Sequence, residues 1–237
     1  MMNSFDLYTK TPPLRLFFTV AIPGAISMVV SSLWGLFDGI FVGQFLGEQA
    51  FAAVNLAFPL MLINFSLADL IGVGSAVPIS IAMGKKQEQE ASNYFTCACI
   101  MIVASGLFVG LLLYMAAPAL LSLMGAEGEL RELATEYIRV YAICSPVTTI
   151  VFAVDNFLRI CGRIKTSMAL NILMSVMIMG LELLCLSVLD MGIGGSALAV
   201  SSGMFICAVV ALYPFWRRQL PLRFCRPRFS ARLIRQI

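Results

Sequence analysis

Six long apolar segments decide what this chain can fold into. They cover about residues 14–46, 50–83, 92–121, 133–158, 166–189 and 195–216. An apolar stretch of this length can cross a lipid bilayer as an α-helix, which needs about 20 residues. Only 12% of the residues are charged, which is about half the share found in soluble domains. We therefore predict an all-α membrane protein with six transmembrane helices.

The basic residues are distributed unevenly around these segments. With a cytoplasmic N-terminus, fourteen of the 16 Lys and Arg residues fall on the cytoplasmic side, and only Arg131 and Arg139 fall outside. The positive-inside rule then predicts that both chain termini are cytoplasmic. We expect a cytoplasmic segment over residues 1–13, a transmembrane lobe over 14–216, and a basic linker with the start of a seventh helix over 217–237. This linker would face anionic lipid headgroups rather than nucleic acid.

The composition argues against an enzyme and against a metal centre. The chain has no histidine, and its seven cysteines lack the spacing of a zinc site. The run Gly84-Lys85-Lys86 lacks the spacing of a phosphate-binding loop. We therefore expect no cofactor, and we expect an ion gradient rather than ATP to supply energy.

Two acidic residues lie deep within the apolar segments. Glu182 is the only charged residue between Thr166 and Leu189, and Asp38 lies in the first segment. Each is eight residues from the outer end of its segment, about 12 Å along a helix. Such residues usually face the bundle interior on an ion or substrate path. Burial and a second nearby carboxylate both disfavour the charged form. The pair could therefore exchange H⁺ near neutral pH or coordinate Na⁺, and the sequence leaves open whether the two side chains face each other.

Other polar residues could line a cavity together with these two acids. The candidates are Trp34, Asp69, Asp155, Asn156, Asn171 and Ser201. Asp155 also lies one helical turn before Arg159, where an i,i+4 ion pair is the simpler interpretation. Pro23 lies within the first segment, where it removes a backbone hydrogen bond and could act as a hinge.

A different pattern precedes the fourth segment. Apolar residues recur at helical spacing over residues 129–141, among charged residues. This amphipathic pattern predicts a helix that lies at the outer membrane interface before the chain enters the bilayer.

Several motifs resemble those of one transporter family. Residues 34–47, Trp-Gly-Leu-Phe-Asp-Gly-Ile-Phe-Val-Gly-Gln-Phe-Leu-Gly, resemble the first-helix signature of the MATE (multidrug and toxic compound extrusion) transporters. Further resemblances cover residues 72–76, 83–86, 156–165 and 192–199. They are similar to the family's second helix, first inner loop, fourth-to-fifth connection and sixth-helix start. The pattern is most similar to the bacterial multidrug exporters.

The resemblance implies an antiporter that exports drugs or organic cations across the bacterial inner membrane in exchange for H⁺ or Na⁺. The family's first-helix Asp corresponds to Asp38, its helix-bending proline to Pro23, and a fifth-helix acid to Glu182. Two positions differ from the family pattern. Ile178 replaces an Asn one turn before the fifth-helix acid, and Val200 replaces a Thr beside Ser201. The identity of the coupling ion is therefore open.

Members of this family have two six-helix lobes with the substrate path between them, and this chain contains one. We expect either a truncated product without its C-terminal lobe or a pair of copies. We favour truncation, because the tail at 230–237 stops within a helix. A non-transporting membrane fragment is an alternative. A lipid-linked oligosaccharide flippase fits less well, because no Lys or Arg lies deep in any segment.

Overall fold

The computed structural model describes residues 12–217, 219–229 and 233. Its helices are α2 (Pro13–Leu46), α3 (Glu48–Gly84), α4 (Glu88–Leu123), α5 (Gly128–Thr148), α6 (Ile150–Ile160), α7 (Ile164–Ser187) and α8 (Gly192–Trp216). Six spans are long and apolar enough to cross a membrane, with α5 and α6 together forming one of them. The predicted all-α fold with six spans is confirmed. Most of the predicted segments 1–13 and 230–237 lies outside the described residues.

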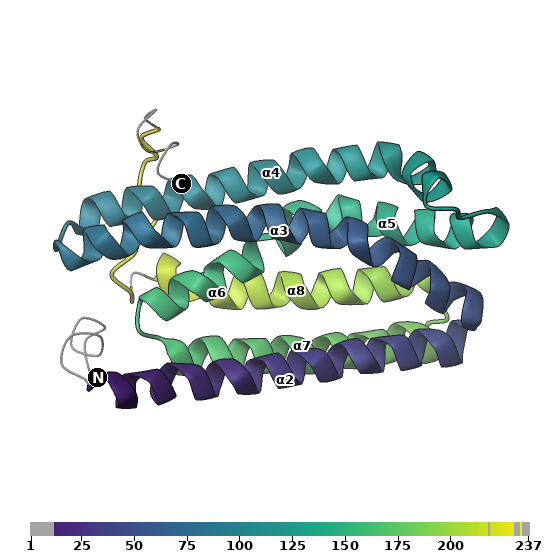
Figure 1. Cartoon of the computed structure of the whole chain (residues 1–237), viewed down its shortest axis with the longest axis horizontal. Helices are drawn as coiled ribbons and strands as arrows, with labels where there is room; N and C mark the ends of the chain where they lie inside the picture. The colour runs from purple at the N-terminus through teal and green to yellow at the C-terminus, as the bar shows by residue number, and fades with distance from the viewer. Residues whose placement is uncertain (1–11, 218, 230–232, 234–237) are drawn as a thin grey trace.

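The helices pack in three layers (Figure 1). α2 and α7 lie side by side at one edge, α6 and α8 occupy the middle, and α3, α4 and α5 form the other edge. α2 begins and α8 ends at the same end of the bundle. We call this end proximal and the opposite end distal.

Buried apolar side chains form two separate cores along the bundle. The proximal core joins the start of α4 to α6 and to the second half of α8, and Phe95 stacks on Phe215 within it at 4.9 Å between ring centroids. The distal core joins the start of α3 and the end of α4 to α5, with Ile138 and Tyr141 at its centre. Polar side chains can therefore gather where the two cores meet.

α2 is the least buried helix of the bundle. Only Ser27 and Val42 are fully buried among its 34 residues. Its connection to α3 is the single residue Gly47, whose φ of 88° lies in the region that favours glycine. α2 is therefore tethered tightly at its distal end and packed lightly along its length.

The fourth span differs from the prediction. α5 runs without interruption from Gly128 into the bundle, and Ala134, Tyr137 and Ile138 are at most 3% exposed in the distal core. The predicted interfacial helix over 129–141 is therefore wrong, because its apolar face packs on neighbouring helices instead of lipid. The span is interrupted at Thr149, three residues after Pro146, which cannot donate a backbone hydrogen bond.

Two glycines let α4 approach this interrupted helix closely. Pro146 leaves the carbonyl of Ala142 without its usual helical donor, and Gly110 of α4 packs directly against that carbonyl. A Cβ atom added at Gly110 would lie 2.6 Å from the Ala142 oxygen, and one at Gly106 would lie 3.2 Å from the Ser145 oxygen. Gly106 and Gly110 have the small-xxx-small spacing that permits tight packing of membrane helices.

We expect Gly110→Ala to destabilise the bundle by about 1–3 kcal/mol, because the new methyl group would overlap with a backbone atom of α5. Thermal unfolding of the purified chain in detergent measures this change. Gly180→Ala is the matched control, since nothing lies within 4 Å of a Cβ at this helical position. Removing that glycine should stabilise α7 by about 0.5–1 kcal/mol. Equal effects of the two substitutions would show that the α4–α5 contact is not close.

Candidate functional site

The two acidic residues of the apolar segments meet in the structure. Asp38 of α2 and Glu182 of α7 come from neighbouring helices, and their carboxyl groups lie within hydrogen-bonding reach of each other. The Glu182 side chain is completely buried, and Asp38 is half-buried. The sequence placed both residues at a similar depth, and the structure adds that they face each other.

This carboxyl pair lies where the proximal and distal cores meet. The helices α2, α7 and α8 each leave one core and enter the other at this level. The flanking core residues are Trp34 and Val42 in α2, Ile178 and Leu186 in α7, and Val200 and Ala197 in α8. The pair is therefore enclosed by apolar layers above and below, which raises the cost of leaving it without a partner.

Residues of two further helices complete the site. The Ser196 hydroxyl of α8 donates a hydrogen bond of 2.8 Å to Glu182 Oε1. The Tyr137 hydroxyl of α5 lies within hydrogen-bonding reach of Ser196 and near both acids. Four helices thus contribute to one polar cluster, in which the two carboxyl groups are the acidic members.

Each acid has one buried oxygen without a hydrogen-bond partner among the described residues, Asp38 Oδ1 and Glu182 Oε2. Two carboxyl groups can hydrogen-bond to each other only if one carries a proton, since an ionised carboxylate accepts and does not donate. The sequence has no Lys or Arg between positions 15 and 85 or between 165 and 217. Arg139 of α5 lies over the Tyr114 ring instead. The arrangement is therefore suited to take up a proton or a small cation.

A chain of buried hydrogen bonds continues from α5 into the distal core. Tyr141, one turn after Tyr137, accepts a bond of 2.9 Å from Asn64 Nδ2, which also donates to Ser145 Oγ at 2.5 Å. Ser145 in turn donates to the carbonyl of Gly106 at 2.9 Å. This network fixes the orientation of α5 and, through it, the position of the Tyr137 hydroxyl.

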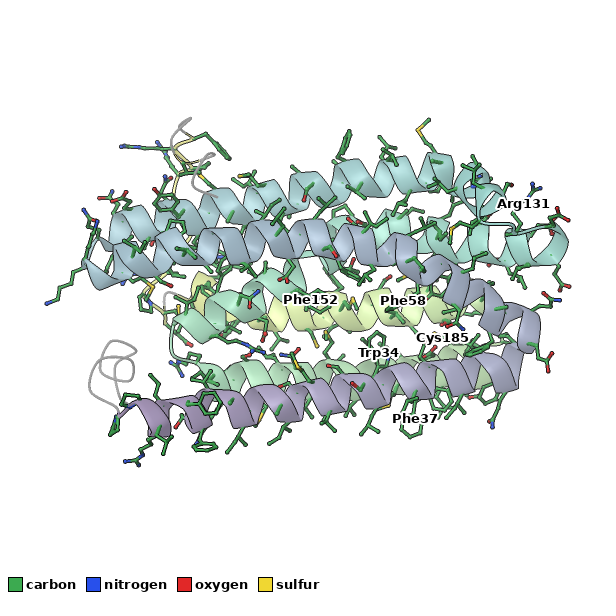
Figure 2. All side chains as sticks on the ribbon, in the orientation of Figure 1. Trp34, Phe37, Phe58, Arg131, Phe152 and Cys185 are labelled. Carbon is green, nitrogen blue, oxygen red and sulfur yellow. The ribbon has the colours of Figure 1, made fainter. Side chains whose placement is uncertain are left out.

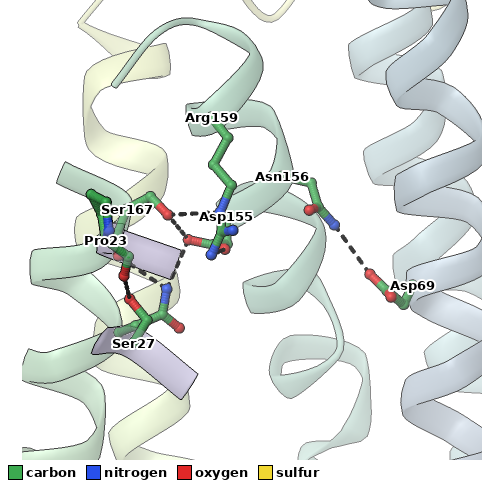
Figure 3. A network of polar contacts seen from close by, with 8 residues as sticks. Pro23, Ser27, Asp69, Asp155, Asn156, Arg159 and Ser167 are labelled. Carbon is green, nitrogen blue, oxygen red and sulfur yellow. Dashed lines mark hydrogen bonds and ion pairs between the residues drawn. The ribbon is translucent and has the colours of Figure 1, made fainter. Parts of the chain in front are cut away.

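A second polar cluster lies at the proximal side, between α6 and α7 (Figure 3). Arg159 forms an ion pair of 2.8 Å with Asp155, as the i,i+4 interpretation predicted. Asp155 also accepts hydrogen bonds from Ser167 and from Asn171, the latter at 2.9 Å. Asp155 and Asn171 line a cavity of about 10 Å³, which is the size of one water molecule. The charge of Asp155 is already balanced, so this cluster is suited to hold α6 and α7 together.

The remaining candidates lie in different surroundings. Asn156 donates to Asp69 at 3.1 Å, which links α6 to α3 at an exposed position (Figure 3). Trp34 lies on the inner side of α2, whereas Phe37 lies on its opposite side (Figure 2). The indole nitrogen of Trp34 and the hydroxyl of Ser201 are buried without a partner among the described residues. Among the described residues, the side chains of Asp69, Asp155, Asn156 and Asn171 contact one another, Arg159 or Ser167, and none of these contacts reaches the carboxyl pair.

Pro23 lies within α2, toward its proximal end. Its carbonyl accepts a hydrogen bond of 3.0 Å from Ser27, and the Arg159 guanidinium lies 3.9 Å from the Cβ position of Gly24. The proximal cluster therefore approaches α2 beside its proline.

Two residues of the site were missed from the sequence. Tyr137 lies within the amphipathic stretch 129–141 and Ser196 within the family-like stretch 192–199, and neither was singled out as a site residue. The sequence signal for each was a hydroxyl side chain on an otherwise apolar helical face. The spacing of apolar residues alone does not distinguish such a site residue from one that only packs against a neighbouring helix.

Comparisons with known proteins agree with the observed fold. The MatE family model matches residues 23–184. "Multidrug export protein MepA" from Staphylococcus aureus is 25% identical over 204 residues, which is 86% of this chain and 44% of the relative. Two crystal structures, described as MATE in the bent and in the straight conformation, are each 26% identical and superpose with a TM-score of 0.89. Each superposition includes 99% of this chain and 52% of the known structure.

The chain thus spans about half the length of the relatives it matches. With its six membrane-crossing helices and these relatives, it is a multi-pass protein of the bacterial inner membrane. The family match extends from Pro23 in α2 to Leu184 in α7, more than half of the chain, and includes both acids of the site. The chain therefore belongs to the MatE family.

Proposed function

We propose that this chain forms one half of a secondary antiporter that exports organic cations or drugs in exchange for H⁺ or Na⁺. The coupling cation would bind between Asp38 and Glu182. One observation carries the proposal: two carboxyl groups from neighbouring helices meet inside the bundle, and each has an oxygen without a described partner. The name of the relative MepA, a multidrug export protein, supports drugs as the exported class.

Cation binding would change the force between α2 and α7. Without a cation, two ionised carboxylates at hydrogen-bonding distance repel each other, and their burial increases the cost. A bound proton or Na⁺ replaces this repulsion with attraction and draws the two helices together. The free energy gained when the cation binds is therefore largest in the conformation in which the two carboxyl groups touch. Ion binding can shift a conformational equilibrium only through such a difference between conformations.

α2 is the helix best suited to respond to this force. It buries only Ser27 and Val42 fully, so few packing contacts must break when it moves. Pro23 removes the backbone donor that would otherwise bind the carbonyl of Thr19, which weakens the helix at that point. The segment from Pro23 to Asp38 would then move as one rigid piece about Pro23 when the cation binds at Asp38.

The substrate path would require a partner. In transporters built from parallel repeats the substrate path lies at the repeat interface, and this chain spans about half of its relatives. The opposing wall would come from a second six-helix lobe or from a second copy of this chain. The residues of the carboxyl site would then act in ion binding and movement, without a catalytic residue or a cofactor.

The first prediction concerns cation binding by the purified chain. ²²Na⁺ binding and the infrared C=O stretch of protonated carboxyl groups report on Na⁺ and H⁺ respectively. We expect Asp38→Asn and Glu182→Gln each to abolish whichever of the two signals the wild type shows. Asp69→Asn is the matched control, since it removes an exposed carboxylate from α3. A signal that survives both substitutions at the pair would contradict the assignment of the site.

The second prediction concerns Pro23. Pro23→Ala restores a backbone donor and should slow amide hydrogen exchange in α2 while cation binding persists, because the carboxyl pair is untouched. The cation-dependent change in exchange along α2 should become smaller. Pro78→Ala within α3 provides the control for removing a helix proline elsewhere. A cation response of α2 that is unchanged by Pro23→Ala would exclude this residue as the hinge.

The third prediction concerns transport in proteoliposomes loaded with a fluorescent organic cation such as ethidium. If the partner is a second copy, the chain alone should support efflux driven by an H⁺ or Na⁺ gradient, and cross-linking should give a dimer. If the partner is a second lobe, only a two-lobed protein should do so. Asp38→Asn should abolish efflux in the active form, and undiminished efflux would refute ion coupling through this residue.

A further inference from the structure

The segment that follows α8 is docked on the bundle. Residues 219–229 pass beside the start of α4, as the yellow trace in Figure 1 shows. Polar side chains of α4 bind the backbone of this segment. The backbone N–H of Arg223 donates to Ser92 Oγ at 3.2 Å, and that of Cys225 donates to Thr96 Oγ1 at 3.1 Å. Asn93 binds Arg228 twice: its Oδ1 accepts from the backbone N–H at 2.8 Å, and its Nδ2 donates to the carbonyl at 3.2 Å. Leu220 and Leu222 are buried in the proximal core. We call this segment the docked linker.

The docked linker, the α3–α4 turn and the start of α4 line an open cavity of about 820 Å³. Three cationic side chains line the cavity: Lys86 from the turn, and Arg226 and Arg228 from the linker. Two anionic side chains, Glu88 and Glu90, line it from the start of α4. Among the described residues, none of these five forms an ion pair within 4.0 Å. Arg228 is positioned by its own backbone bonds and Arg226 by the backbone bond of its neighbour Cys225, so neither guanidinium group is used to hold the linker in place.

The length of α4 would place this cavity at the level of the lipid headgroups. α4 has 36 residues and is about 54 Å long at 1.5 Å per residue, whereas a bilayer with its headgroups is about 40–45 Å thick. With its middle at the bilayer centre, α4 would extend through the phosphate layer at both ends, and its first turns would lie among the headgroups. Phe224 and Phe229 of the docked linker are 46% and 49% exposed, and exposed Phe side chains are found on segments that bury an apolar face at the headgroup boundary.

We propose that this cavity binds the headgroup of a phosphatidylethanolamine-type phospholipid. The phosphate is held by Lys86, Arg226 and Arg228, and the primary ammonium by Glu88 and Glu90. The mixed lining favours this headgroup over two others. A purely anionic headgroup would leave both carboxylates facing negative charge, and the quaternary ammonium of phosphatidylcholine has no N–H to donate to them. This site does not depend on the proposed transport function.

Native mass spectrometry of the delipidated full chain, titrated separately with phosphatidylethanolamine, phosphatidylglycerol and phosphatidylcholine, tests the proposal. We expect phosphatidylethanolamine to bind most tightly. Arg226→Gln and Arg228→Gln should each weaken its binding about fivefold, the equivalent of about 1 kcal/mol for one basic residue at a membrane surface. Glu88→Gln with Glu90→Gln should remove the preference over phosphatidylcholine while binding through the phosphate persists.

The matched controls are Lys85→Gln and Arg217→Gln, tested singly, because each removes one positive charge from the proximal end without touching the cavity lining. Each should leave both the affinity for phosphatidylethanolamine and the preference for it unchanged. Because the docked linker is held through backbone atoms, the arginine substitutions should also leave the thermal stability of the lipid-free chain unchanged. Tighter binding of phosphatidylglycerol, an equal effect of either control, or displacement of the lipid by inorganic phosphate would each overturn the proposal.

Discussion

The contact between Asp38 and Glu182 is the constraint around which this bundle is arranged. A buried carboxyl pair is unfavourable unless a proton or cation lies between its members, and the sequence provides no basic residue in the same parts of α2 and α7. The surrounding structure meets this requirement in part, through the hydrogen bond from Ser196 to Glu182. The pair therefore retains a capacity for one more positive charge. Under the proposed function, that capacity would make the site responsive to the ions on either side of a membrane.

The rest of the lobe divides into a firmly packed part and a lightly packed part. α4 and α5 approach each other through Gly106 and Gly110, and Asn64 fixes Tyr141 and Ser145 of α5 by direct hydrogen bonds. These contacts hold one wall of the site in place. The opposite wall is α2, which has few buried residues and contains Pro23. A change of charge between a fixed wall and a movable wall produces motion mainly in the movable one.

Much of this fold could be predicted from the sequence, because a bilayer imposes a length and a polarity that apolar segments reveal directly. The similar depth of Asp38 and Glu182 also followed from counting residues along two helices. Their facing each other did not, since helical spacing identifies a face but not the neighbour on which it packs. For the same reason the apolar face of α5 was assigned to lipid, although Ala134 and Ile138 are fully buried against other helices. The docking of residues 219–229 was missed because side chains such as Asn93 bind its backbone, and backbone atoms carry no sequence signal.

The central claim is that Asp38 and Glu182 form one cation site and not two. A double-mutant cycle on cation affinity, with Asp38→Asn, Glu182→Gln and the combined variant, tests this claim most directly. If the two carboxyl groups share one cation, either single substitution removes nearly all of the binding free energy, and the combined variant loses no more than each single one. Losses that add up from the single variants to the combined variant would show two independent sites and would contradict a shared cation.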